Sequence, residues 1–317
     1  MLPFVFVHIP KTAGTSLRKG LEAALSREVI EYDYGLDSAE TTPLVREFIY
    51  ERKDPWLFRQ KCCSQNVKVV AGHFAAEKYV HLFGAERLVT FLREPLQRII
   101  SEFKHFQRHN GFEGSFEDYF NRPSFKNRQT ALIGQVPIPL CGFVGLTDYF
   151  MESLTQAGEF MQIDIPNLEL NLGKRATSDT HEIAPEVLNR LRKQNLQDLN
   201  LYQKTRDWWA QVHVQRDGKA PLLRGEIDSL ADNKIAGWAF WDDSNRAAVL
   251  EVLVEGKPVG ICKATLFKPR LNMYRARRNG YVGFEKTLRD LRPGQRVEVR
   301  AKSTQQQLFG SPLVFNR

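Results

Sequence analysis

The chain has 317 residues, 42% of them hydrophobic, and 45 lysines and arginines against 37 aspartates and glutamates give a formal charge of +8 at pH 7. This length fits one large domain or two medium ones, and the positive charge favours anionic ligands. No zinc-finger, RNP or helix-turn-helix signature is present, and no apolar run reaches about 18 residues, so neither nucleic-acid binding nor an integral membrane segment is expected. The four cysteines lack C-x-x-C spacing and the density of a disulfide scaffold, which indicates a reducing compartment.

The first predicted strand leads directly into a candidate anion-binding loop. An apolar run over residues 2–9 and a helical pattern from Leu17 onward predict a strand, a tight loop and a helix. At such a junction, unpaired backbone N–H groups and the positive end of the helix dipole converge. We expect Gly14 to let the backbone close around a ligand, the hydroxyl groups to act as donors and Lys11 to add a charge. The predicted anion-binding residues are Lys11, Thr12, Ala13, Gly14, Thr15 and Ser16.

The spacing within this loop separates it from two common nucleotide-binding motifs. A nucleoside-triphosphate P-loop requires G-x-x-x-x-G-K-[ST], whereas Lys11 precedes the single glycine of this loop, Gly14. One glycine also falls short of the dinucleotide fingerprint G-x-G-x-x-G. A simple turn is the alternative, but a lysine, a glycine and three hydroxyl side chains within six residues exceed what a turn requires. The ligand should therefore be a phosphate or a close relative.

A second buried-type strand is predicted over residues 67–74 and ends in Gly72-His73. Loops at the carboxyl ends of parallel strands form the ligand crevice of α/β sheets, so we expect His73 to project into it. Histidine titrates near neutral pH and suits a general base, although a structural hydrogen bond at the strand end is the alternative. Glu77 is the rival base.

A third strand is predicted over residues 88–92, and Arg93 follows it directly. A helical pattern then extends from Pro95 through about His109, and Pro95 suits the first turn because its missing N–H group has no partner there. Arginine suits phosphate binding because its rigid fork bonds two oxygens at once. The alternative is that Arg93 only pairs with a neighbouring carboxylate.

The pattern changes after about residue 214. Helical patterns over residues 185–195 and 197–214 precede a polar stretch, 215–224, that is typical of a linker. Beyond it, short runs of alternating apolar and polar residues are separated by turn residues, which predicts a small antiparallel β-sandwich. The expected architecture is an α/β domain, residues 1–214, with a P-loop-like parallel sheet flanked by helices, followed by a β-sandwich accessory domain, residues 225–317.

The loop and the two later strand ends resemble the sulfotransferases, which bind 3′-phosphoadenosine-5′-phosphosulfate (PAPS). More narrowly, they resemble the carbohydrate-directed branch, which includes the uronyl 2-O-sulfotransferases. The resemblance implies that the first loop binds the 5′-phosphosulfate and that Arg93 and Ser101 hold the 3′-phosphate. It also implies that His73 is the catalytic base, although Ala71 stands where those enzymes carry a second histidine.

Weaker similarity to this family continues to about residue 212. The matching segments are residues 127–132, 143–150, 171–175 and 195–202. Lys174 and Arg175 either add charge near the 3′-phosphate or form a solvated basic pair. In the second predicted domain, Gly225–Asp228 and Gly237–Ala239 resemble a β module appended to some bacterial glycan-modifying enzymes. Its aromatic residues form either a sugar-stacking platform or part of a core; they are Trp238, Phe240 and Trp241.

The resemblance implies an enzyme, a PAPS-dependent O-sulfotransferase that moves a sulfuryl group to a hydroxyl of a sugar or glycan and releases PAP. Lys11 stabilises the leaving phosphate and His73 accepts the hydroxyl proton in this scheme, which requires no metal. Golgi members of the family are usually membrane-anchored, so this chain is expected to be a bacterial, cytoplasmic enzyme. Three alternatives remain: a catalytically silent PAP- or PAPS-binding protein, a glycan-binding protein and an ATP-dependent kinase.

Overall fold

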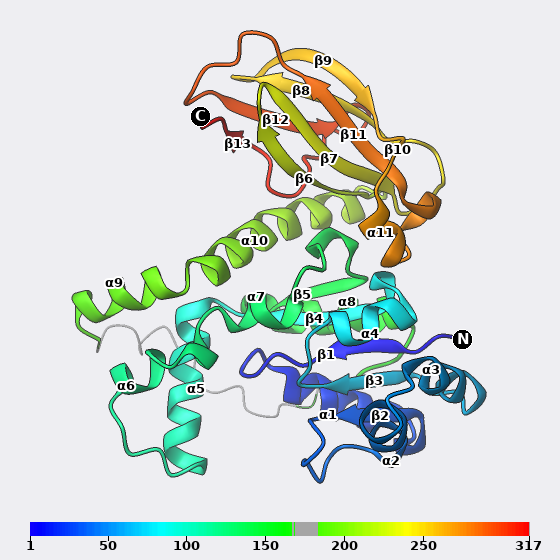
Figure 1. The fold of residues 1–317 in the computed structure, drawn as a ribbon, viewed down its shortest axis with the longest axis vertical. Coiled ribbons are helices and arrows are strands. Elements are labelled where there is room, and N and C mark those ends of the chain that lie inside the picture. The colour runs from blue at the N-terminus through cyan, green and yellow to red at the C-terminus, as the bar shows by residue number, and fades with distance from the viewer. Residues whose placement is uncertain (167, 169–182, 317) are drawn as a thin grey trace. The chain divides into compact units, whose positions relative to one another are not determined.

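A computed structural model describes residues 1–166, 168 and 183–316 (Figure 1). Contacts divide the chain into two compact units, which are Met1–Val136 with Cys141–Tyr202, and Pro137–Leu140 with Gln203–Arg317. The family match at residues 171–175, with Lys174 and Arg175, lies outside the described residues.

The first unit is built on a five-stranded sheet in which each pair of neighbouring strands is parallel. The strands are β1 (Phe4–Val7), β2 (Ile30–Asp33), β3 (Val69–Gly72), β4 (Leu88–Leu92) and β5 (Phe143–Leu146), in the order β2-β3-β1-β4-β5. All five are buried along their length, which explains why β1, β3 and β5 lack polar alternation. The predicted parallel sheet is confirmed.

Helices flank this sheet. They are α1 (Gly14–Ala24), α2 (Pro43–Val45), α3 (Pro55–Ser64), α4 (Glu77–Phe83), α5 (Pro95–His109), α6 (Phe116–Phe120), α7 (Arg128–Ile133), α8 (Phe150–Met161) and α9 (Pro185–Gln194). Leu17 and Leu21 of α1 share one hydrophobic core with Leu154 and Ala157 of α8 and with side chains from all five strands. The spacing of four residues between Leu17 and Leu21 puts both on one helix face, so α1 and α8 cover one face of the sheet.

The central strand β1 brings three loops to one edge of the sheet. Its last residue, Val7, pairs with Gly72 at the end of β3 and with Thr90 near the end of β4. Because all three strands are parallel, the loops that follow them leave the sheet on the same side. These three loops carry most of the predicted site residues.

The second unit contains two four-stranded antiparallel sheets, ordered β10-β11-β7-β6 and β13-β12-β8-β9. Their strands are β6 (Leu223–Ala231), β7 (Lys234–Trp241), β8 (Val249–Val254), β9 (Lys257–Lys263), β10 (Leu266–Phe267), β11 (Tyr281–Thr287), β12 (Arg296–Ala301) and β13 (Leu313–Val314), with a short helix α11 (Pro269–Met273). Ile235 and Phe284 of the first sheet join Leu250 and Val299 of the second in one hydrophobic core. Alternate residues of β8 and β12 face that core, which explains the period of two in these parts of the sequence.

Half of the stretch predicted as a linker, residues 215–224, belongs to regular elements, and residues 218–222 connect them. Helix α10 (Leu196–Asp217) covers its first residues and β6 begins at Leu223. Glutamine and arginine at positions 215 and 216 are good helix formers, so their polarity marks an exposed helix end rather than a loop. The contact-based division into two units falls within this helix, after Tyr202.

The three aromatic residues considered for a sugar platform are buried. Trp238, Phe240 and Trp241 are 1%, 4% and 7% exposed. Trp241 belongs to the core of the second unit, and Trp238 stacks on Phe240 with ring centroids 5.8 Å apart. The interpretation of Trp238 as a core residue is confirmed. The alternative, that these rings form an open platform for stacking a sugar, is wrong because all three are buried.

Candidate functional site

The loop between β1 and α1 holds two residues in an unusual backbone conformation. Lys11 and Ala13 have φ angles of 67° and 62°, in the left-handed region that residues with a Cβ rarely adopt. Between them, the buried Thr12 donates a hydrogen bond of 2.9 Å from its hydroxyl to the carbonyl of Ile9. The Thr12 hydroxyl therefore fixes the turn, whereas the sequence interpretation assigned it to the ligand.

Gly14 is required for a reason that differs from the one expected. It is the first residue of α1, and a Cβ added to it would lie 2.1 Å from Cδ2 of His8. The His8 side chain is buried and packs against the rings of His73 and Tyr34, which restricts its movement. The glycine thus lets the helix approach the His8 ring, while Lys11 and Ala13 supply the left-handed turn.

The first turn of α1 carries the last two predicted residues of the loop. Thr15 is exposed, and Ser16 is buried. The Ser16 N–H donates a hydrogen bond of 3.0 Å to the carbonyl of Ala13, which closes the first turn. The start of this helix therefore directs its dipole toward the turn that contains Lys11.

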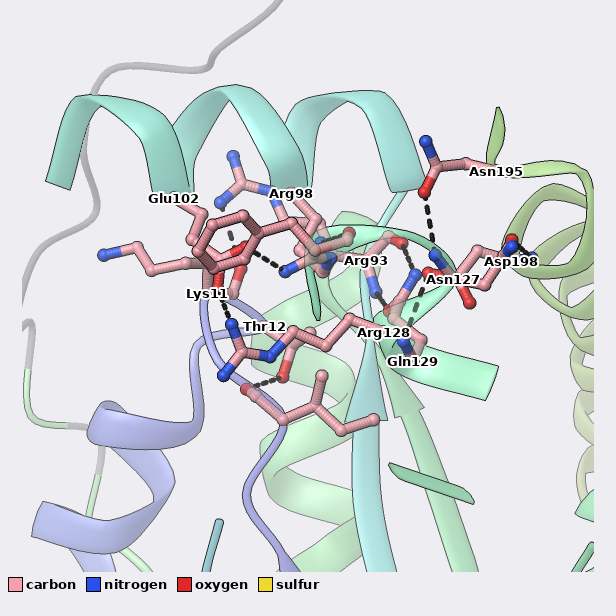
Figure 2. Close-up of polar contacts among 12 residues, drawn as sticks. Lys11, Thr12, Arg93, Arg98, Glu102, Asn127, Arg128, Gln129, Asn195 and Asp198 are labelled. Atoms are coloured by element: carbon pink, nitrogen blue, oxygen red, sulfur yellow. Dashed lines mark hydrogen bonds and ion pairs between the residues drawn. The ribbon is translucent and has the colours of Figure 1, made fainter. Parts of the chain in front are cut away.

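Lys11 and Arg93 come together at the sheet edge, although 82 positions separate them. Nη1 of Arg93 donates a hydrogen bond of 3.2 Å to the backbone carbonyl of Lys11 (Figure 2). Burial, and then the charges of Arg93 and Arg108, lower the pKa of the Lys11 amino group, and Glu102 partly opposes this. The crowded positive charges create a local potential that favours a bound anion.

Helix α5 carries a buried acidic residue that sequence reasoning missed. Glu102 is 1% exposed and accepts hydrogen bonds from Arg98 at 2.8 Å and from Arg128 at 2.7 Å. The spacing of four residues between Arg98 and Glu102 was the available signal. Ser101 is half-buried beside Glu102, and within the described part of the chain its side chain forms no hydrogen bond with another predicted site residue.

His73 contacts the same loop from β3. Its Nδ1 lies 2.5 Å from the backbone carbonyl of His8. A carbonyl oxygen only accepts hydrogen bonds, so Nδ1 carries the hydrogen and Nε2 of the neutral ring keeps its lone pair. Desolvation, helped by the charge of Arg128, lowers the pKa of His73, while the bond to His8 works in the opposite direction. Solvent nevertheless reaches this ring, so a basic nitrogen is available near neutral pH.

His8 supports both the first loop and His73. Its ring centroid lies 4.5 Å from that of His73, and its Nδ1 lies 3.1 Å from the hydroxyl of Tyr34. Tyr34 in turn packs edge-on against His73, with centroids 4.8 Å apart. Burial, followed by the charges of His73, Arg18 and Lys11, lowers the pKa of His8 to about 3. His8 therefore stays neutral in the folded protein.

A buried carboxylate at the end of β2 was also missed from the sequence. Asp33 is 1% exposed and accepts hydrogen bonds from Lys78 at 2.6 Å, Tyr50 at 2.5 Å and Tyr79 at 2.7 Å. Burial acts to raise the pKa of Asp33, but these hydrogen bonds outweigh it and hold the pKa below its usual value. The Asp33 carbonyl accepts a bond of 3.1 Å from the His73 N–H, so this cluster fixes the backbone beside His73.

Glu77, the rival base, contacts a different segment. Its carboxylate accepts a hydrogen bond from the N–H of Gln135. A Cβ added to Gly134 would lie 1.9 Å from its Oε2, so the carboxylate packs directly on this turn. Glu77 thus contacts the turn at residues 134–135, whereas His73 contacts the first loop.

The described residues contain neither a metal-binding cluster nor a helix that could span a membrane. Among them, no group of three or more histidine, cysteine, aspartate or glutamate side chains is arranged to hold a metal ion. No helix in that part of the chain combines the length and the apolar character needed to cross a membrane.

Comparisons with known proteins add little information about the function of this chain. No protein-family model matches the sequence, and no curated protein matches it either. The crystal structure of a sulfotransferase from Alicyclobacillus acidocaldarius overlaps 62% of this chain and 93% of its own chain, with 14% identity and a TM-score of 0.33. An overlap this loose assigns neither a family nor a fold, so the functional argument depends on the residues at the sheet edge.

Proposed function

We propose that the chain is a sulfotransferase that moves a sulfuryl group from PAPS to a hydroxyl of a sugar or glycan and releases PAP. The observation that supports this most is the meeting of Lys11 and Arg93, which come from loops after two adjacent strands. An ammonium group, a guanidinium group and a helix N-terminus at one edge suit a ligand with two separated anionic groups. The similarity of both loops to those of sulfotransferases points to PAPS as that ligand.

In this proposal the donor lies between the two loops. The loop from Lys11 to Ser16 binds the 5′-phosphosulfate, and Arg93 with Ser101 binds the 3′-phosphate. During transfer, the acceptor oxygen bonds to sulfur while the bond from sulfur to the bridging oxygen breaks, and negative charge passes to the phosphate of PAP. Lys11 and the loop N–H groups stabilise this charge as it grows, so they act more on the transition state than on the bound donor.

His73 takes the proton of the acceptor hydroxyl on Nε2 in the same step. Two observations support this role: the hydrogen bond from Nδ1 to the His8 carbonyl leaves Nε2 with its lone pair, and the lowered pKa keeps the ring neutral near pH 7. The resulting imidazolium returns its proton to water, which reaches the ring.

We also infer that residues 225–317 form a β-sandwich accessory domain. The inward side chains of both antiparallel sheets belong to one core, which supports two sheets packed face to face.

Ligand-dependent melting tests the nucleotide assignment directly. We expect PAP to raise the melting temperature more than AMP, which lacks the 3′-phosphate, and more than ATP with magnesium, because a ligand that binds the folded state stabilises it. A larger rise with ATP and magnesium, and none with PAP, would indicate the kinase alternative. Transfer from sulfur-labelled PAPS to a panel of neutral and acidic oligosaccharides then identifies the acceptor.

Replacing Lys11 tests the catalytic role. We expect Lys11→Ala to remain folded and to lose about 100- to 1,000-fold in kcat, in the range of one lost charge-stabilising donor. Lys19→Ala, on the exposed surface of α1, is the matched control and should keep normal turnover. Near-normal turnover of Lys11→Ala would refute the role of Lys11.

A further inference from the structure

We infer that Gln129 is a positioning residue for Arg93, an inference that rests on the proposed function and deepens it. The Gln129 side-chain Oε1 accepts a hydrogen bond of 2.9 Å from the Arg93 N–H, and its Nε2 donates one of 2.9 Å to the Arg93 carbonyl (Figure 2). Gln129 is 0% exposed, so water does not compete for these bonds. One amide thus holds both polar backbone groups of the residue whose guanidinium reaches Lys11.

The place of Arg93 in the chain explains why such a support matters. Strand β4 ends at Leu92, which pairs with Leu146, so Arg93 is the first residue beyond the sheet ladder. Gln129 supplies its backbone with the pair of hydrogen bonds that a neighbouring strand would otherwise provide. The Arg93 side chain therefore leaves from a backbone that is held as firmly as a strand.

Asp198, at the start of α10, holds Gln129 in turn. Its carboxylate accepts hydrogen bonds from the backbone N–H groups of Gln129 at 3.1 Å and Thr130 at 2.7 Å, and from the Thr130 hydroxyl at 2.7 Å. These N–H groups belong to the first turn of α7, where a carboxylate satisfies unpaired donors and meets the positive end of the helix. Asp198 is 0% exposed, so this cap is shielded from solvent.

The Asn127 side chain caps the start of α10 in the same way. Its side-chain oxygen accepts hydrogen bonds from the N–H groups of Gln197 at 3.1 Å and Asp198 at 3.2 Å, and its own N–H donates to Asn195 at 2.9 Å. Asn127 adopts a left-handed conformation, with φ of 48°, which asparagine tolerates better than most residues. Residues 127–130 and the start of α10 thus cap each other, and this mutual cap fixes the position of Gln129.

Binding measurements on Gln129 variants test the inference. Gln129→Met removes both hydrogen bonds to Arg93, and Gln129→Glu keeps an acceptor for the N–H but loses the donor. We expect each variant to weaken PAP binding by about tenfold or more, as measured by titration calorimetry, with a much smaller change for AMP, because Arg93 is assigned to the 3′-phosphate. Gln129→Glu decides the question if Gln129→Met does not fold.

Ser153 offers a matched control. It is also 0% exposed, and its hydroxyl bonds the N–H and the carbonyl of Leu146, the last residue of β5, at 3.0 Å and 3.2 Å. Ser153→Ala should lower the melting temperature of the free protein, as the Gln129 variants do, but should change PAP affinity by less than about twofold.

A double-mutant cycle separates positioning from general loosening. If Gln129 acts through Arg93, Gln129→Met added to Arg93→Ala should weaken PAP binding by less than about twofold further. The inference is overturned if the Gln129 variants bind PAP like the wild type, or if their loss is the same with and without Arg93. A wild-type protein that binds PAP no better than AMP overturns the proposed function, and the inference with it.

Discussion

In the first loop, Lys11 and Ala13 adopt backbone conformations that are energetically unfavourable. Each lies in the left-handed region, which costs a residue with a Cβ roughly 1–2 kcal/mol. Such conformations persist where surrounding contacts determine them, here the hydrogen bond from Thr12 to Ile9 and the close approach of Gly14 to His8. The loop is thus held in one shape before any ligand arrives.

Substitution of Gly14 should disturb this shape. A methyl group would lie 2.1 Å from the buried His8 ring, so we expect Gly14→Ala to lower the free energy of urea unfolding by about 1–3 kcal/mol. Adding His8→Ala should recover part of the loss, because it removes the atoms that clash. A single variant as stable as the wild type would contradict the close packing.

The buried His8 ring predicts a pH dependence of stability. Its pKa is about 3 in the folded protein and about 6.5 when exposed in the unfolded chain. Below pH 6.5 the unfolded chain takes up a proton that the folded protein refuses, so unfolding becomes easier by up to about 1.4 kcal/mol per pH unit. We expect the free energy of urea unfolding of His8→Gln to fall less steeply between pH 6.5 and pH 4.5 than that of the wild type. Equal slopes would contradict this assignment.

At the scale of elements, buried polar clusters join strand ends to helices. Asp33 fixes the end of β2 to α4 through Lys78 and Tyr79. We expect Asp33→Ala to lower the free energy of unfolding by about 2–4 kcal/mol, because the buried Tyr79 hydroxyl loses its acceptor. Asp37→Ala, in the exposed turn that follows β2, should change it by less than about 0.5 kcal/mol in the same denaturation assay. A similar loss in both variants would contradict the role of the cluster.

The elements that carry the site could be predicted from sequence because their signals are local. The apolar run at residues 88–92 and the helical pattern from Pro95 to His109 coincide with β4 and α5. The contact of Gln129 with Asp198 spans 69 positions, and no local pattern indicates it. The backbone angle of Lys11 could not be predicted either. A glycine normally adopts the left-handed conformation in such a loop, but here Gly14 is needed for its close contact with the His8 ring.

For the whole molecule, the presence of two cores predicts two unfolding events. The core of the first unit and that of the second share no residues. We expect calorimetry to resolve two unfolding transitions. PAP should raise the midpoint temperature of only one of them, because it stabilises the first unit by about 2.7 kcal/mol when its concentration is 100 times Kd. A single transition, or an equal shift of both, would show that the units unfold together.

The mutual capping of Asn127 and Asp198 bridges 71 positions of the chain, and this has a consequence for biosynthesis. A nascent polypeptide that has left the ribosome as far as α9 already contains every strand of the parallel sheet. Yet the carboxylate that steadies Gln129 is still inside the exit tunnel. If Gln129 acts on Arg93 as inferred, recognition of the donor begins only once α10 emerges, and a premature stop codon before it yields a sheet that cannot hold its nucleotide.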